Sequence, residues 1–130
     1  MFGRVAISCA VSHPLGALAV AVSTAPLPDA MGLAFLFSIL GCFYLVPEAI
    51  FMAGAIRLLD NTDSRIRRVI LSFGVVAIGA LMGALLAFKV SGSVPRDYRI
   101  GYTVAGAIVG IVPCVLAHLF PRETKSETRA

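Results

Sequence analysis

Tryptophan is absent from this 130-residue sequence, and charged residues make up only 14% of it. The three cysteines, Cys9, Cys42 and Cys114, all lie inside apolar segments, and an odd number in such places is a poor disulfide framework. We interpret them as small buried apolar side chains. Hydrophobic residues make up 58% of the chain, more than one small water-soluble core could bury, so the sequence indicates a membrane protein.

Motifs for catalysis or cofactor binding are also missing. The sequence lacks a Ser-His-Asp arrangement, paired carboxylates, a phosphate-binding glycine loop and a Cys-x-x-Cys pair. Its cysteines and histidines show no spacing that is typical of a metal site. We therefore expect no enzymatic activity, no metal and no cofactor. The net charge of +4 is spread over short loops and forms no continuous basic face, so we expect no nucleic-acid partner.

Four apolar runs dominate the chain. Each is long enough to cross a bilayer, since about 20 residues at roughly 1.5 Å each span the hydrocarbon core. They predict an all-α membrane protein with four transmembrane helices, at about residues 5–25, 30–57, 66–90 and 99–120. We expect one polytopic membrane domain over residues 1–130, ending in a mobile polar tail at 121–130.

The first apolar run has one feature of a secretory signal peptide. Ala19-Val20-Ala21 has the small-x-small form of a cleavage site. However, the run is long, and Ser12-His13-Pro14 interrupts it. We expect the first helix to be retained, with cleavage as the alternative.

The basic residues predict the orientation of the helices. On one side of the membrane lie eight of the 11 Lys and Arg residues: Arg4, Arg57, Arg65, Arg67, Arg68, Arg122, Lys125 and Arg129. Because cytoplasmic loops carry an excess of Lys and Arg, this distribution predicts that both termini are cytoplasmic. The short chain and its basic loop favour a multi-pass protein of a cell inner (cytoplasmic) membrane.

Small residues recur at helical spacing in the last two expected helices. Gly79 and Gly83 lie four residues apart in one helix, and Gly106 and Gly110 lie four apart in the other. In lipid, this spacing lets two helix backbones approach closely. We expect these glycines to pack the third helix against the fourth, with a contact between two copies of the chain as the alternative.

Glu48 is the only ionisable side chain within the apolar stretch 30–56. A charge near the bilayer centre costs about 2.5–3.5 kcal/mol, so such residues are functional candidates by default. Depth along the helices places His13 and Cys114 in a similar layer, on the cytoplasmic side of the midplane. Glu48 and His13 are therefore the candidate proton or ion site. The alternative is a structural tie, in which Glu48 hydrogen-bonds His13 or a hydroxyl such as that of Ser12.

Two kinds of function fit this pattern. The first is a non-enzymatic membrane protein that acts through helix-helix contacts, as an accessory or self-associating subunit. The second is a small proton-coupled transporter or channel that uses Glu48 within the bilayer. Expected partners are the lipid bilayer and either a second copy of the chain or another membrane protein.

Overall fold

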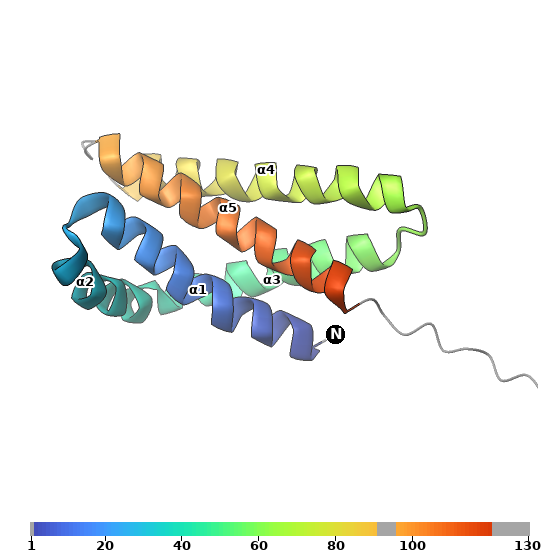
Figure 1. Cartoon of the computed structure of the whole chain (residues 1–130), viewed down its shortest axis with the longest axis horizontal. Helices are drawn as coiled ribbons and strands as arrows, with labels where there is room; N and C mark the ends of the chain where they lie inside the picture. The colour runs from blue at the N-terminus through green and yellow to red at the C-terminus, as the bar shows by residue number, and fades with distance from the viewer. Residues whose placement is uncertain (1, 91–95, 121–130) are drawn as a thin grey trace, which may run out of the picture.

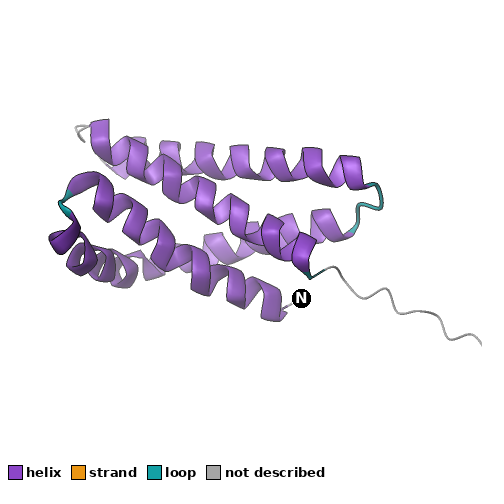
Figure 2. Ribbon diagram, in the orientation of Figure 1, coloured by secondary structure: helices purple, strands orange, loops and turns teal. Residues whose placement is uncertain are grey.

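The computed structural model of the chain describes residues 2–90 and 96–120 (Figure 1). Its elements are α1 (Phe2–Thr24), α2 (Leu27–Leu40), the 3₁₀ helix η1 (Gly41–Tyr44), α3 (Leu45–Asp60), α4 (Arg65–Val90) and α5 (Arg96–Leu119). No strand occurs in these ranges, and short turns join α1 to α2 and α3 to α4 (Figure 2). The predicted tail at 121–130 lies outside the described residues.

Four segments are long and apolar enough to cross a membrane, which confirms the expected number of spans. The second of them comprises α2, η1 and α3 together. α5 packs against both α4 and α1, and α1 packs in turn against α2 and α3. The N-terminus, the α3–α4 turn and the last turn of α5 lie at one end of the bundle, and the α1–α2 turn lies at the other (Figure 1).

The second span begins earlier than the sequence predicted, at Leu27 rather than near residue 30. Pro26 is the extended residue that precedes the helix, and Pro28 occupies its first turn. Amides in the first turn have no acceptor within the helix, so proline costs nothing there and its fixed φ suits the start. Pro26 and Pro28 thus mark the start of the helix, and the turn between α1 and α2 is correspondingly short.

The second span is also not one continuous α-helix, as was expected for 30–57. The 3₁₀ helix η1 interrupts it between Leu40 and Leu45. Pro47 explains the position of the break, because its ring would clash with the carbonyl group four residues earlier in a regular α-helix. At 34 residues the segment is about 50 Å long, well beyond a hydrocarbon core of about 30 Å.

The most extensive helix pair is α4 with α5. A Cβ atom added to Gly79 would overlap the carbonyl oxygen of Gly106, and one added to Gly83 would overlap the backbone of α5. A Cβ on Gly110 would come within 2.8 Å of the Cα atom of Val76. The four glycines therefore allow a backbone approach that no other residue permits, and they do so within a single chain.

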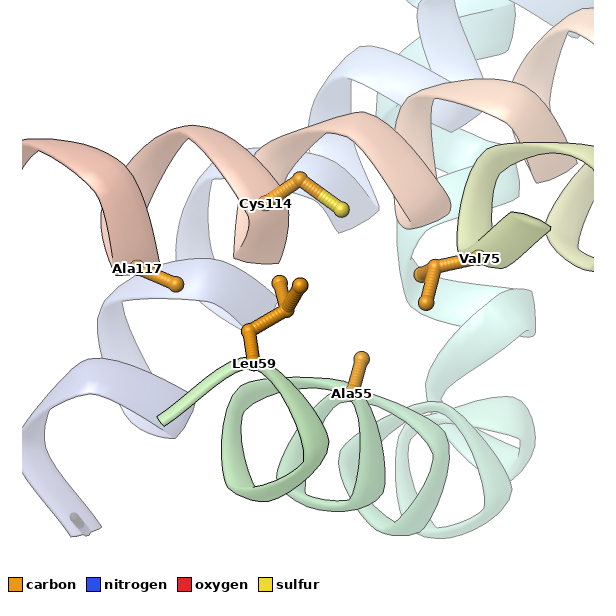
Figure 3. Close-up of a cluster of buried hydrophobic side chains, with 5 residues drawn as sticks. All are labelled: Ala55, Leu59, Val75, Cys114 and Ala117. Carbon is orange, nitrogen blue, oxygen red and sulfur yellow. The ribbon is translucent and has the colours of Figure 1, made fainter. Parts of the chain in front are cut away.

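The end of α3 is fixed to α4 and α5 by a buried apolar cluster (Figure 3). Its members are Ala55 and Leu59 from α3, Val75 from α4, and Cys114 and Ala117 from α5. Nearby, the Arg4 guanidinium donates two hydrogen bonds to the Asp60 carboxylate, at 2.6 and 3.1 Å. The same guanidinium donates to the carbonyl oxygen of Phe120 at 3.2 Å, so α1, α3 and α5 are joined at this end.

The glycine contacts generate a prediction for stability. We expect Gly106→Ala to lower the free energy of unfolding by about 1–3 kcal/mol, because its methyl group would overlap the α4 backbone. Gly74→Ala is the matched control, since nothing lies within 4 Å of a Cβ atom there. Denaturant titration of the protein in micelles measures both. Equal stability of the two variants would contradict the close approach of α4 and α5.

Candidate functional site

Glu48 lies in the first turn of α3 and meets α1. Its side chain is only 8% exposed. The Ser12 hydroxyl donates a hydrogen bond to Oε1 of Glu48 at 2.5 Å, and Nδ1 of His13 lies 3.2 Å from Oε2. Adjacent residues of α1 thus bind both oxygens of the carboxyl group, which compensates for its removal from water.

The second ring nitrogen of His13 fixes the protonation of the pair. Nε2 lies 3.0 Å from the carbonyl oxygen of Ser38 on α2. A carbonyl oxygen only accepts, so Nε2 must carry a proton. Nδ1 then either accepts a hydrogen bond from a protonated Glu48 or, as part of an imidazolium, donates one to the carboxylate. When both contacts of the ring are hydrogen bonds, His13 and Glu48 share one proton and have no net charge.

Gly41 is what allows His13 to reach α2. A Cβ atom at Gly41 would lie 3.0 Å from Cε1 and 3.3 Å from Nε2 of the His13 ring. Neither Gly41 nor Ser38 was expected from the sequence to belong to this site. The available signal was a glycine inside an apolar helical run, six residues before Pro47, where a retained glycine often has a packing reason.

The thiol groups of Cys9 and Cys114 lie in different parts of the bundle. The Cys9 thiol donates to Sδ of Met52 at 3.6 Å, on the α1–α3 contact that also holds Glu48. Cys114 instead belongs to the α3–α4–α5 cluster of Figure 3, where its thiol faces the carbonyl oxygen of Ser72. Cys114 therefore packs among α3, α4 and α5 and not beside the His13–Glu48 pair. Nε2 of His118 lies 3.2 Å from the Ser72 hydroxyl.

No three His, Cys, Asp or Glu side chains gather into a metal-binding group within the described ranges. The four glycines that were expected to pack the last two helices face one another across α4 and α5. They are Gly79, Gly83, Gly106 and Gly110. They lie on different elements from the His13–Glu48 pair, yet three of them reach the same internal space.

That space is a cavity of about 500 Å³ between α1, the second span, α4 and α5. Ser12, His13 and Glu48 form part of its wall, and Gly79, Gly83 and Gly106 form another part. Its larger apolar lining residues are Val20, Leu40, Phe51, Met82, Leu86 and Val109. Cavities of this size hold small organic ligands, and few convergent polar groups in an apolar wall are typical of such sites.

Comparison with known proteins yields no relative: no family model, no curated protein and no solved structure matches this chain.

The contact between Gly41 and His13 can be tested directly. We expect Gly41→Ala to displace the His13 ring and to break the Nε2 hydrogen bond to Ser38, because the added methyl group would lie 3.0 Å from the ring. Nitrogen-15 NMR of the labelled imidazole reports this bond. Gly32→Ala in the same span is the control, since nothing lies within 4 Å of a Cβ atom there. An unchanged His13 spectrum in Gly41→Ala would refute this placement of the ring.

Proposed function

We propose that this protein is a proton-coupled transporter of a cell inner membrane, which exchanges a small solute for the proton shared by Glu48 and His13. The observation that supports this most is that the pair lines a cavity of about 500 Å³ within the helix bundle. The Glu48 side chain is only 8% exposed, yet it forms part of the wall of this space, which a purely structural tie between two helices does not require. Next to open space, its proton can leave when a solute takes its place.

A proline within α1 and the break in the second span, both beside the ionisable pair, add support. Pro14 follows His13 within α1, while η1 and Pro47 precede Glu48. Each proline removes a helical hydrogen bond and leaves a carbonyl group available to a ligand or to water. Transporters commonly place their binding sites at such broken helices.

For the orientation we propose cytoplasmic termini. One end of the bundle holds the N-terminus, the α3–α4 turn and the last turn of α5 (Figure 1). The arginines near this end are Arg4 at the start of α1, Arg57 in the last turn of α3, and Arg65, Arg67 and Arg68 in the first turn of α4, whereas Arg99 lies near the start of α5. By the positive-inside rule this end faces the cytoplasm.

An accessory or self-associating subunit was the other function expected from the sequence. The residues that favoured self-association were the glycines spaced four apart in the last two helices. Those glycines pack α4 against α5 inside one chain, so they are not free to pair with a second copy. A partner protein stays a prediction, and the transport function is the one that the cavity favours.

Proton movement in proteoliposomes tests the proposal. A pH-sensitive dye inside the vesicles records protons that move when inorganic cations, organic cations, neutral solutes or anions are added outside. We expect at least one class to move protons, and Glu48→Gln to reduce that rate at least tenfold, because an amide keeps hydrogen bonds but has no exchangeable acid proton. Asp29→Asn, which changes an exposed acid of α2, should leave the rate unchanged. Proton movement that persists in Glu48→Gln, or is absent for every solute class, contradicts the proposal.

A further inference from the structure

The charged groups in the cavity wall determine which ligand charge the cavity can neutralise. Among the described residues that line the cavity, Glu48 is the only acid and none is Lys or Arg. When His13 is neutral, the Glu48 carboxylate is the one charge in an apolar space. It can neutralise a single positive charge, whereas a second positive charge or an anion would stay uncompensated at low dielectric.

The composition of the wall argues for an organic cation. A hard cation such as Ca²⁺ or Mg²⁺ requires about six oxygen ligands, and the polar end of the cavity offers mainly the oxygens of Glu48 and Ser12. Aromatic residues also line the cavity: Phe37, Tyr44, Phe51 and Tyr102. Aromatic faces attract organic cations, and the apolar wall favours a ligand with an apolar body.

The cavity is open toward the bilayer on one side. α4 packs along α5 and meets α3, but no comparable packing joins α4 to α2 among the described residues. Leu40 of α2 and Met82 of α4 both line the cavity, yet they are 58% and 49% exposed. Figure 1 shows α2 and α4 apart, with α1 and α5 between them in that view. A ligand dissolved in the membrane can therefore enter between α2 and α4.

From these observations we infer that the cavity binds a monovalent lipophilic organic cation, which enters from the bilayer and displaces the shared proton. The inference rests on the proposed function, because it names the solute of that exchange. The step is balanced in charge and in atoms. The cation pairs with the Glu48 carboxylate, the shared proton leaves to water from either group, and His13 ends neutral with Nε2–H on the Ser38 carbonyl oxygen.

Other titratable groups around Glu48 do not alter this count. Beside His13 they are Cys9 on α1, Tyr44 on η1 and Tyr102 on α5. Free thiol and phenol groups are protonated and neutral at pH 7. The His13–Glu48 pair begins with one proton in either of its arrangements, so each bound cation releases one proton.

Two ions of the same shape and opposite charge test the inference. Tetraphenylphosphonium and tetraphenylborate are titrated into the protein in nanodiscs, in weakly buffered solution, while heat and released protons are recorded. We expect tetraphenylphosphonium to bind with release of one proton per ion, and tetraphenylborate to release none. Glu48→Gln should lower the affinity for the cation at least tenfold, or about 1.4 kcal/mol, and Asp29→Asn should not change it.

A second pair of variants leaves the Glu48 hydrogen bonds intact. Met82→Trp fills part of the cavity near its opening, whereas Leu81→Trp adds the same side chain to a neighbouring position that does not line the cavity. We expect only Met82→Trp to weaken binding of tetraphenylphosphonium, again by at least tenfold.

The outcomes separate this inference from the transport proposal. Equal binding of both ions, or cation binding that neither Glu48→Gln nor Met82→Trp weakens, indicates an apolar cavity filled by lipid and overturns the inference. If tetraphenylphosphonium fails to bind while another solute class moves protons through Glu48, the ligand class is wrong and transport stands. If the cation binds with release of one proton but no solute drives proton movement in vesicles, the ligand class stands and transport is wrong.

Discussion

The structure depends on one constraint: a carboxyl group within a lipid-embedded bundle must be neutralised and hydrogen-bonded on every side. Glu48 meets this constraint through Ser12 and His13, which are consecutive on α1. His13 in turn needs an acceptor for its second nitrogen, and the Ser38 carbonyl group supplies it. One acidic side chain thereby fixes the relation of α1 to both halves of the second span.

The remaining helices are held by contacts of another kind. Glycine-to-backbone packing brings α4 against α5, and the apolar cluster with the Arg4–Asp60 ion pair joins α3 to the bundle at one end. None of these contacts draws α4 toward α2. The cavity exists because α4 packs against α5, whereas the Glu48 contact holds the second span against α1, so the two sides stay apart.

Features that depend on composition along the chain could be predicted from the sequence. The four spans follow from the apolar runs, and Glu48 and His13 stand out because ionisable groups are costly there. Features that depend on rotation about a helix axis could not. Depth placed Cys114 in the same layer as Glu48, but height along a helix does not say which neighbour a side chain faces, and Cys114 faces Ser72. The break at η1 could not be placed from the sequence, because residues 41–44 are apolar like the rest of the span. The proline that causes the break lies after them, at position 47.

The most direct test of the account is the number of protons on the His13–Glu48 pair at neutral pH without ligand. The infrared spectrum of the protein in nanodiscs, minus that of Glu48→Gln, isolates the Glu48 carboxyl band, and nitrogen-15 NMR of the same sample gives the protonation of His13. The account requires one shared proton: a protonated carboxyl group beside a neutral imidazole, or a carboxylate beside an imidazolium. A carboxylate beside a neutral imidazole, or a protonated carboxyl group beside an imidazolium, would contradict it.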